Sequence, residues 1–370
     1  MFKAEELFQN VTDKNHPDET VLTIIQGKGT LPREQAGRNI HYDDASLSNY
    51  KKVEQGDFII HLRSFEGGLE MANEAGIVSP AYTILRCKRP HSSLFYDAYF
   101  HTDEFINHNL SKSVEGIRDG RQISYEAFKW LGIPYCEPTE QEQISSLFSV
   151  LNERIAKQRN LVESLKKYKR GVSDYLFLQN SKMPIHCKWK QFSFGDVVKI
   201  NPKTPPLPEQ FIYIDLECVE SGQLKSLNYI NKNHAPSRAQ RVLCRNDVLF
   251  QMVRPYQKNN YLYRDIFDVP VVASTGYAQI RCSECNPFFV YEQISSEQFS
   301  REAMMRSTGT GYPAINADGL AQIPFYVPTP EEQEKIGVFL SALGAKIAKE
   351  SEILAALDII KKALMQQLFT

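Results

Sequence analysis

The chain contains an internal duplication in which its middle returns at its end, 192 residues later. Asn152–Phe177 aligns with Gly344–Phe369, and apolar side chains occupy matching positions in the two segments. Their spacing alternates between four and three, a heptad pattern typical of helices that pack along a narrow seam. One copy in each half indicates a duplicated module rather than a solenoid. The predicted seam comprises Ile144, Phe148, Leu151, Ile155, Val162, Leu165, Val172 and Leu176, and their equivalents Ile336, Leu340, Leu343, Ile347, Leu354, Leu357, Leu364 and Leu368.

The duplication extends into the segments that precede the two helices. Val53–Leu62 aligns with Leu243–Met252 at an offset of 190, and Val78–Tyr82 aligns with Ala273–Tyr277 at an offset of 195. A proline-containing segment leads into Glu-Gln-x-x-Ile before each helix. We therefore predict globular domains over 1–137 and 183–327 and helical regions over 138–182 and 328–370. The long helices themselves are expected over about 140–178 and 332–369.

Composition is compatible with two folded domains. A hydrophobic content of 42% in 370 residues is sufficient to build two cores. The chain starts without the apolar stretch of a signal peptide and has no run long enough to span a bilayer, so we expect a cytoplasmic protein. Seven scattered cysteines do not suggest a disulfide framework. Cys282 and Cys285 have a metal-like spacing, but zinc needs about four ligands, so no metal site is predicted.

Each globular domain is expected to be mixed α/β, which places the chain in the α+β class. Short segments rich in β-branched or aromatic residues predict strands, and turn residues precede several of them. Helical patterning covers Tyr96–Asn107 and Ser124–Leu131, whereas the proline-rich run Asn201–Pro208 predicts a surface loop. The predicted strands are Thr20–Gln26, Phe58–Arg63, Ile77–Leu85, Phe211–Asp215, Val248–Val253 and Val271–Arg281.

The long helices need a partner for their apolar faces. A helix over Glu140–Phe177 would reach roughly 57 Å. One small domain cannot cover so long and narrow a stripe, whereas two such helices laid side by side can cover each other as a coiled coil. An antiparallel pair would give a pseudo-two-fold dumbbell with the globular domains at opposite ends. The alternative is that each helix packs on its own domain.

This arrangement resembles the specificity (S) subunits of type I restriction-modification systems. That family alternates two variable target-recognition domains with two conserved helical regions. Each helical region is introduced by a proline-containing Glu-Gln-x-x-Ile segment and ends in a basic stretch followed by Leu-Phe. The matching segments here are Pro138–Phe177 and Pro328–Phe369. Gly56–Ile60 and Gly76–Tyr82 are also similar to the start of such a recognition domain, so the resemblance covers essentially the whole chain.

The resemblance implies a protein that reads double-stranded DNA without catalysing a reaction. Each globular domain would read one half of a bipartite target, and the paired helices would set the spacer between the halves. Major grooves recur on one side of B-DNA about every 34 Å, a separation that helices of this length can match. The implied partners are two modification (methyltransferase) subunits, docked on the exposed helix surfaces, and ATP-dependent restriction subunits that join the complex. No cofactor is implied.

Basic side chains supply candidate DNA contacts, although the net charge is only −1. A lone DNA-binding domain is usually strongly basic, so partner subunits would supply further phosphate contacts. Arginine can fork onto guanine, and asparagine or glutamine onto adenine. Individually, each lysine could instead lie on a solvated helix face, and the glycine-rich Thr308–Tyr312 could be an ordinary turn. The DNA-binding candidates are Arg63, Arg118, Arg121, Gln122, Lys169, Arg170, Arg241, Arg254, Tyr256, Gln257, Lys258, Gly309 and Tyr312, with Asn259 and Asn260 in the same run as Arg254.

No catalytic residues are predicted. Asn286–Phe289 is similar to the Asn-Pro-Pro-Phe/Tyr loop of amino-methyltransferases, but it lacks the second proline, and no suitable glycine-rich cofactor loop precedes it. The sequence also lacks the phosphate-binding Gly-x-x-x-x-Gly-Lys-Ser/Thr loop, and its eight histidines form no His-x-x-x-His pattern. Two other classes remain open at this point. One is a non-enzymatic coiled-coil scaffold protein, and the other is a self-contained DNA methyltransferase.

Overall fold

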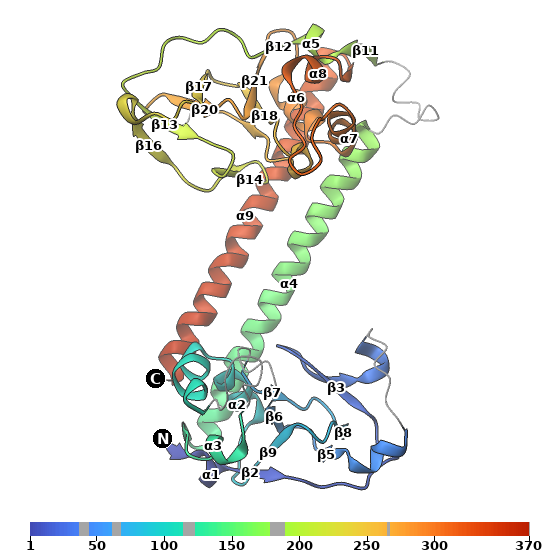
Figure 1. The fold of residues 1–370 in the computed structure, drawn as a ribbon, viewed down its shortest axis with the longest axis vertical. Helices are drawn as coiled ribbons and strands as arrows, with labels where there is room; N and C mark the ends of the chain where they lie inside the picture. The colour runs from blue at the N-terminus through green and yellow to red at the C-terminus, as the bar shows by residue number, and fades with distance from the viewer. Residues whose placement is uncertain (37–43, 61–67, 114–122, 178–188, 265–266, 370) are drawn as a thin grey trace. The chain divides into compact units, whose positions relative to one another are not determined.

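The computed structural model describes residues 1–369 except 37–43, 61–67, 114–122, 178–188 and 265–266 (Figure 1). The chain divides into two compact units. The first comprises Met1–Arg159 and Glu352–Thr370, and the second comprises Asn160–Ser351. Both combine sheets with helices, in agreement with the α+β class. Because the unit boundaries fall inside the long helices, each unit contains the start of one long helix and the end of the other.

The first unit contains a four-stranded sheet of order β2-β9-β6-β7. Further strands pair as β3 with β4, as β5 with β8 and as β1 with β10, and a parallel bridge joins Val21 to Ile77. Its strands are β1 (Phe2–Lys3), β2 (Phe8–Val11), β3 (Leu22–Ile25), β4 (Gly29–Pro32), β5 (Lys51–Val53), β6 (Phe58–Ile60), β7 (Glu70–Met71), β8 (Gly76–Val78), β9 (Thr83–Cys87) and β10 (Gly132–Ile133). Its helical segments are α1 (Ala4–Leu7), η1 (Arg33–Ala36), η2 (Asp44–Asn49), α2 (Ser93–Phe100), η4 (Glu104–Asn109), η5 (Leu110–Ser113) and α3 (Tyr125–Phe128), followed by the long helix α4 (Pro138–Phe177).

The second unit contains two four-stranded sheets, of order β12-β21-β18-β19 and β16-β13-β20-β17, and the pairs β11–β22 and β14–β15. Its strands are β11 (Lys190–Ser193), β12 (Val198–Ile200), β13 (Gln210–Ile214), β14 (Val219–Glu220), β15 (Gln223–Leu224), β16 (Asn228–Asn231), β17 (Ala239–Val242), β18 (Val248–Gln251), β19 (Tyr261–Leu262), β20 (Val271–Ser274), β21 (Tyr277–Cys282) and β22 (Pro324–Val327). Its helical segments are α5 (Phe194–Val197), η8 (Lys232–His234), η9 (Pro255–Gln257), α6 (Pro287–Ile294), α7 (Glu297–Met305) and α8 (Ala317–Ala321), followed by the long helix α9 (Pro330–Phe369).

The two units repeat one topology. The sheet β2-β9-β6-β7 corresponds strand by strand to β12-β21-β18-β19, and the pair β1–β10 corresponds to β11–β22. In both units a four-residue helix follows the first strand of the unit. The second sheet is repeated as well. Its strand order is β4-β3-β8-β5 in the first unit, with the Val21–Ile77 bridge joining its two halves, and β16-β13-β20-β17 in the second. The repetition seen in the sequence is therefore also a repetition of strand order.

Equivalent turns lead into the central strands β6 and β18. Gly56 in the first unit has φ +90°, and Asn246 in the second has φ +66°. Both lie in the left-handed region, which glycine adopts without cost and asparagine tolerates better than most residues. The change from glycine to asparagine between the two halves therefore preserves the conformation of the turn.

In each unit an arginine forms a forked hydrogen bond with the buried aspartate that follows this turn. Arg86 donates to Asp57 from Nε at 2.9 Å and from Nη2 at 2.7 Å. Arg281 donates to Asp247 from Nε and Nη2, each at 2.8 Å. The two aspartates are nearly inaccessible, at 3% and 1% exposure. Because a fork of this kind fixes both distance and angle, the pair holds the turn against β9 in one unit and against β21 in the other.

The glutamine of each Glu-Gln motif ties a long helix to a short one. Gln141 accepts from the backbone N–H of Ser92 at 3.0 Å, and Gln333 accepts from that of Asn286 at 2.8 Å. Each side-chain amide also donates to the backbone carbonyl five residues earlier, at 2.8 and 3.1 Å. Ser92 and Asn286 are the N-cap residues of α2 and α6. The motif thus anchors the start of α4 to α2 and the start of α9 to α6.

Each core is completed by the end of a long helix. In the first unit Phe369 lies 5.1 Å from Phe95 and stacks on Phe148 at 6.0 Å, measured between ring centroids. In the second unit Phe177 packs edge-on against Phe289 at 5.9 Å. The start of α4 and the end of α9 therefore share the first core, and the end of α4 and the start of α9 share the second.

Most predicted seam positions are buried or half-buried, including Phe148, Ile155, Val162 and Leu340, which are all below 9% exposure. Leu368 was assigned to the seam wrongly, because its side chain is 41% exposed and the following Phe369 is buried instead. The reason is local, since the aromatic cluster around Phe95 accepts a ring at this end of α9. Coiled-coil packing along the full length of the helices remains a prediction.

Two predicted strands are each two strands joined by a tight turn. Ile77–Leu85 divides into β8 and β9, and Val271–Arg281 divides into β20 and β21. The break falls in the aligned Ser79–Tyr82 and Ser274–Tyr277, where proline without an N–H and glycine without a side chain favour turns. A motif recognised as a strand is therefore the connection between two strands.

The predicted helix Tyr96–Asn107 is also interrupted. Helix α2 ends at Phe100, and a second helical segment begins at Glu104. Between them, Thr102 Oγ1 accepts from the N–H of Phe105 at 3.1 Å, which satisfies a free donor of the new turn. The Pro-rich run Asn201–Pro208 contains neither helix nor strand, as expected. Among the helices of the described residues, none has the length and apolar content to cross a membrane.

Candidate nucleic-acid interface

Two loops of the second unit bring several of the predicted DNA-binding residues together. The N–H of Arg254 donates to the carbonyl of Pro313 at 2.7 Å, which joins the loop after β18 to the loop after α7. The Arg254 guanidinium lies 4.3 Å from the ring centroid of Tyr312. Tyr312 is 69% exposed and Tyr256 is 51% exposed. Gly309, with φ +92°, forms the turn that returns the second loop toward the first.

The Arg254 loop has an unusual backbone that buried side chains hold in place. Arg254 and Lys258 both have φ +54°, in the left-handed region that non-glycine residues seldom adopt. Gln251, only 2% exposed, donates to the carbonyl of Val253 and to Gln257 Oε1, each at 2.8 Å. Strained backbone of this kind persists where surrounding contacts determine it, and it is frequent at functional sites. Sequence reasoning missed Gln251, although a polar residue on a buried strand could have marked it.

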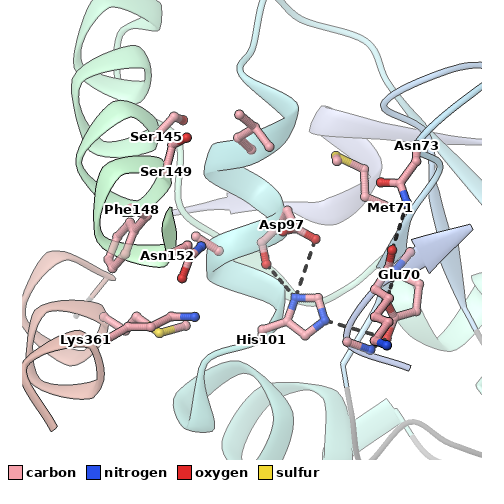
Figure 2. A pocket seen from close by; sticks show the side chains of 16 residues that line it. Glu70, Met71, Asn73, Asp97, His101, Ser145, Phe148, Ser149, Asn152 and Lys361 are labelled. Atoms are coloured by element: carbon pink, nitrogen blue, oxygen red, sulfur yellow. Dashed lines mark hydrogen bonds and ion pairs between the residues drawn. The ribbon is translucent and has the colours of Figure 1, made fainter. Parts of the chain in front are cut away.

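The two loops border a cavity of about 390 Å³. A larger cavity, of about 580 Å³, lies in the first unit (Figure 2). Arg254, Gln257 and Tyr312 line one part of the cavity beside the loops. The other part is lined by Leu216, Glu217, Val219, Glu220 and Lys225. The second wall includes the β14–β15 hairpin, whose turn has positive φ at Ser221 and Gly222. Sequence reasoning did not assign this wall, although Ser-Gly is a recognisable hairpin turn. The cavity thus presents an arginine, an amide and an exposed aromatic ring, the groups that bind base edges and stack on bases.

Basic side chains next to the loops are partly neutralised. Lys258 Nζ lies 2.5 Å and Arg170 Nη2 3.7 Å from Glu297 Oε1. The hydrogen bond from Lys258 is the main cause that lowers the pKa of Glu297. Arg170 keeps 68% of its side chain exposed, whereas Lys258 keeps 25%. Arg170 is therefore the better placed of the two for a phosphate contact.

Three candidates are placed differently from the prediction. Lys169 Nζ lies 3.0 Å from both carboxylate oxygens of Glu292, whose side chain is 4% exposed, so its charge is already matched inside the unit. Asn260 is 1% exposed and accepts from the N–H of Gln251, so it supports the loop and cannot reach a base. Arg241 lies half-buried on the edge strand β17 of the other sheet, where burial lowers the pKa of its guanidinium. In the first unit, Arg63, Arg118, Arg121 and Gln122 lie outside the described residues.

The residues that had suggested other chemistry have structural roles. Asn286 Oδ1 accepts from the N–H groups of Phe288 and Phe289 at 2.9 and 3.2 Å, so it caps α6. Cys285 belongs to the core of the second unit and Cys282 packs against it. Burial raises the pKa of the Cys282 thiol to about 12, which disfavours the thiolate that binds metals.

Comparison with known proteins agrees with this architecture. Residues 187–358 match the family described as "Type I restriction modification DNA specificity domain". The chain is 25% identical over 189 residues to the type I restriction enzyme HindI specificity subunit of Haemophilus influenzae, across 49% of this chain and 40% of that protein. It is 20% identical over 340 residues to the MjaVIII specificity subunit of Methanocaldococcus jannaschii, across 86% of this chain and 79% of that protein. Residues 187–358 thus match the specificity domain, and most of the chain is similar to type I specificity subunits.

Solved structures show the same fold. The S subunit of a type I system from M. genitalium superposes with a TM-score of 0.62 at 14% identity, covering 100% of this chain and 95% of that one. A chain from a study of complex assembly and conformational transition in a type I R-M system gives a TM-score of 0.57 at 14% identity, covering 99% and 96%. Similarity to proteins named as specificity subunits supports the prediction of a DNA-recognition component.

Proposed function

We propose that this specificity subunit reads a bipartite DNA target, one half with each globular domain, and that the two long helices set the spacer between the halves. The observation that carries the proposal is the repeated topology, which supplies two readers of the same design with different loops. Two unlike readers require an asymmetric target. Helices of 40 residues extend about 60 Å, which is long enough to separate two readers by a turn of DNA.

In the second unit, the Arg254 and Tyr312 loops form the base-reading surface. The Tyr312 ring holds the guanidinium by a cation–π contact, and an arginine oriented in this way can direct its fork at guanine O6 and N7. Gln257 is exposed on the same loop and can address adenine. Tyr256 is available for stacking, and Arg170 supplies a phosphate contact that gives affinity without sequence preference.

Partner subunits complete the assembly. Apolar side chains remain exposed along both long helices, among them Val150 at 63%, Val338 at 56% and Ile359 at 67% exposure. Exposed apolar surface of this kind is suited to protein contacts. Two modification subunits would dock on these surfaces, and restriction subunits would join through them. The net charge of −1 fits such a division, because the partners then provide additional phosphate contacts in the cytoplasm, where the DNA lies.

The test is methylation mapping of the host genome with the wild-type gene, without the gene and with Arg254→Ala. Arg254→Ala should relax the preference in one half-site only, at a cost of about 1–3 kcal/mol in discrimination at the affected base. Arg245→Ala is the matched control, because it removes an exposed arginine at the other end of β18. Equal loss in both half-sites would contradict the assignment. A scaffold protein would show no salt-dependent DNA affinity, and a self-contained methyltransferase would bind S-adenosylmethionine when purified alone.

A further inference from the structure

A buried glutamine bonds to both ends of the Arg254 loop. Gln251 is the last residue of β18 and is only 2% exposed. Its Nε2 donates to the carbonyl of Val253 at 2.8 Å, and its Oε1 accepts from the N–H of Asn259 at 3.2 Å. A backbone carbonyl can only accept and a backbone N–H can only donate. These two contacts therefore fix which side of the Gln251 amide is nitrogen and which is oxygen.

The same nitrogen orients a second amide, that of Gln257. Gln251 Nε2 donates to Gln257 Oε1 at 2.8 Å. Because a donor faces it, Gln257 turns its oxygen inward, and its nitrogen takes the other side of the amide. Gln257 is exposed and lines the cavity of about 390 Å³ beside the loops. Among the residues that the structure describes, none accepts a hydrogen bond from Gln257 Nε2, so this nitrogen keeps both of its donors free.

Another buried amide holds Gln251 against the rest of the unit. Asn260, at 1% exposure, accepts from the backbone N–H of Gln251 at 3.0 Å. Its Nδ2 donates to the carbonyl of Ile294 and to Ser295 Oγ, each at 3.4 Å, at the end of α6. Buried amides whose donors and acceptors are satisfied stiffen the structure around them. The orientation of Gln257 is thus imposed by the fold of the second unit.

The Arg254 side chain, which lines the same cavity, has the same hydrogen-bonding polarity. A guanidinium carries five N–H donors and no acceptor. Arg254 and Gln257 therefore both present donors, and they complement base edges that present acceptors. In the major groove guanine offers two acceptors, N7 and O6, whereas adenine offers one acceptor and one donor, and cytosine offers the N4 donor.

We propose that Gln251 is a positioning residue that makes Gln257 a donor-only reader, so that Gln257 contacts guanine and rejects cytosine at one position of the half-site. This inference deepens the proposed function and rests on it, because it requires the Arg254 loop to lie in the major groove. A glutamine that is free to rotate pairs with adenine through one donor and one acceptor. With Oε1 turned inward to Gln251, only the donor faces the groove, which narrows the choice to guanine.

The first test replaces the donor that faces the groove. Gln257→Glu keeps an oxygen for Gln251 Nε2 and puts a second oxygen in place of the outward nitrogen. The preferred base at one position should change from guanine to cytosine, whose N4 amino group donates to a carboxylate. The half-site is taken from methylation mapping. Competition binding then compares duplexes that differ at each position, using the complex of this chain with its modification subunits. The ratio of guanine to cytosine affinity should change at least about tenfold.

Gln223→Glu is the matched control for the added charge. It places a carboxylate on the exposed strand β15 of the neighbouring hairpin, outside the lining of this cavity. It should weaken binding to all duplexes alike, because the new charge repels phosphates whatever the base. If Gln257→Glu also weakens all duplexes equally, or leaves the preference for guanine unchanged, the proposal is overturned.

The second test separates positioning from stability. Gln251→Leu frees the Gln257 amide, so the preference for guanine over adenine should fall roughly fivefold at the same position. Gln279→Leu is the control, because Gln279 is an equally buried glutamine of the paired strand β21 that donates to Val242 and Asp247 and not to the loop. It should lower the stability of the second unit, read by hydrogen exchange, without changing base preference. Equal relaxation in both variants would contradict the positioning role.

Arg254→Ala distinguishes this inference from the proposed function. If Arg254→Ala relaxes one half-site while Gln257→Glu leaves guanine preferred, the loop reads DNA and the donor-only assignment is wrong. If neither substitution changes the preference of a half-site, the loop does not read bases, and the proposed function fails at its reader in the second unit.

Discussion

In the second unit β13 pairs in parallel with β20 over three positions, whereas in the first unit the equivalent strands meet at the Val21–Ile77 bridge. Charged side chains beside the long helices differ as well, because the buried Glu292 pairs with Lys169 in the second unit, whereas His101 lies between Glu70 and Asp97 in the first (Figure 2). The contacts that hold each unit together and attach it to the long helices hardly differ. The aspartate–arginine fork, the motif glutamine and the terminal phenylalanine recur in both units with the same partners. The two units thus differ in the pairing at the centre of one sheet and in charged side chains beside the long helices.

The largest effect should come from removing a buried aspartate of the shared framework. Asp247→Ala leaves Arg281 without its carboxylate partner. It also removes one of the two acceptors of the buried Gln279 amide, which donates to Asp247 at 2.6 Å and to the carbonyl of Val242 at 3.0 Å. We expect the second unit to lose about 3–5 kcal/mol, as for other broken buried pairs. Asp57→Ala should cost the first unit somewhat less, because the fork to Arg86 lacks the glutamine. Amide hydrogen exchange followed by mass spectrometry assigns each loss to a unit, and loss of protection in both units from one substitution would contradict the expectation that each fork stabilises only its own unit.

A second test removes the phenylalanine at the end of each long helix. Phe369→Ala, at the end of the chain, should destabilise the first unit by about 3 kcal/mol, because its ring is part of the cluster with Phe95 and Phe148. Phe177→Ala should act in the same way on the second unit through Phe289. Tyr175→Ala is the control, since that α4 side chain is 50% exposed. Hydrogen exchange is again the measurement, and weakened protection in the unit that precedes each helix in the chain would reverse the assignment.

The duplication itself could be predicted from the sequence, because apolar spacing and repeated motifs are properties of the chain. Periodicity predicted which positions of the long helices are buried or half-buried, but not that Phe369 is buried in place of Leu368. Only the cluster around Phe95 shows which of these two adjacent apolar residues points inward. Arg254 and Tyr312 were proposed by residue type, whereas their contact depends on a pairing across 58 residues of sequence that no local pattern encodes. Lys169 shows the opposite case. A lysine in a basic run looked available for phosphate, and only the fold reveals the buried Glu292 opposite it.

The smallest expected effect is a pH dependence of stability that only the first unit should show. His101 and Ser295 are the equivalent C-cap residues of α2 and α6, so only the first unit has a titrating group at this position. Burial disfavours the His101 cation, but Glu70 and Asp97 outweigh it and raise the pKa of the imidazole. Because the folded pKa lies above the unfolded value of about 6.5, this stabilisation is complete below that pH and is lost as pH rises through the higher folded value.

Denaturant unfolding between pH 5.5 and 8.5, read from first-unit amides, should therefore show stability that declines toward the alkaline end. His101→Gln should remove that decline and leave the second unit unchanged at every pH. The contribution of Glu70 does not interfere, because its pKa is lowered and its loss belongs to a more acidic range. A decline of the same size in His101→Gln would mean that another group of the first unit titrates in this range.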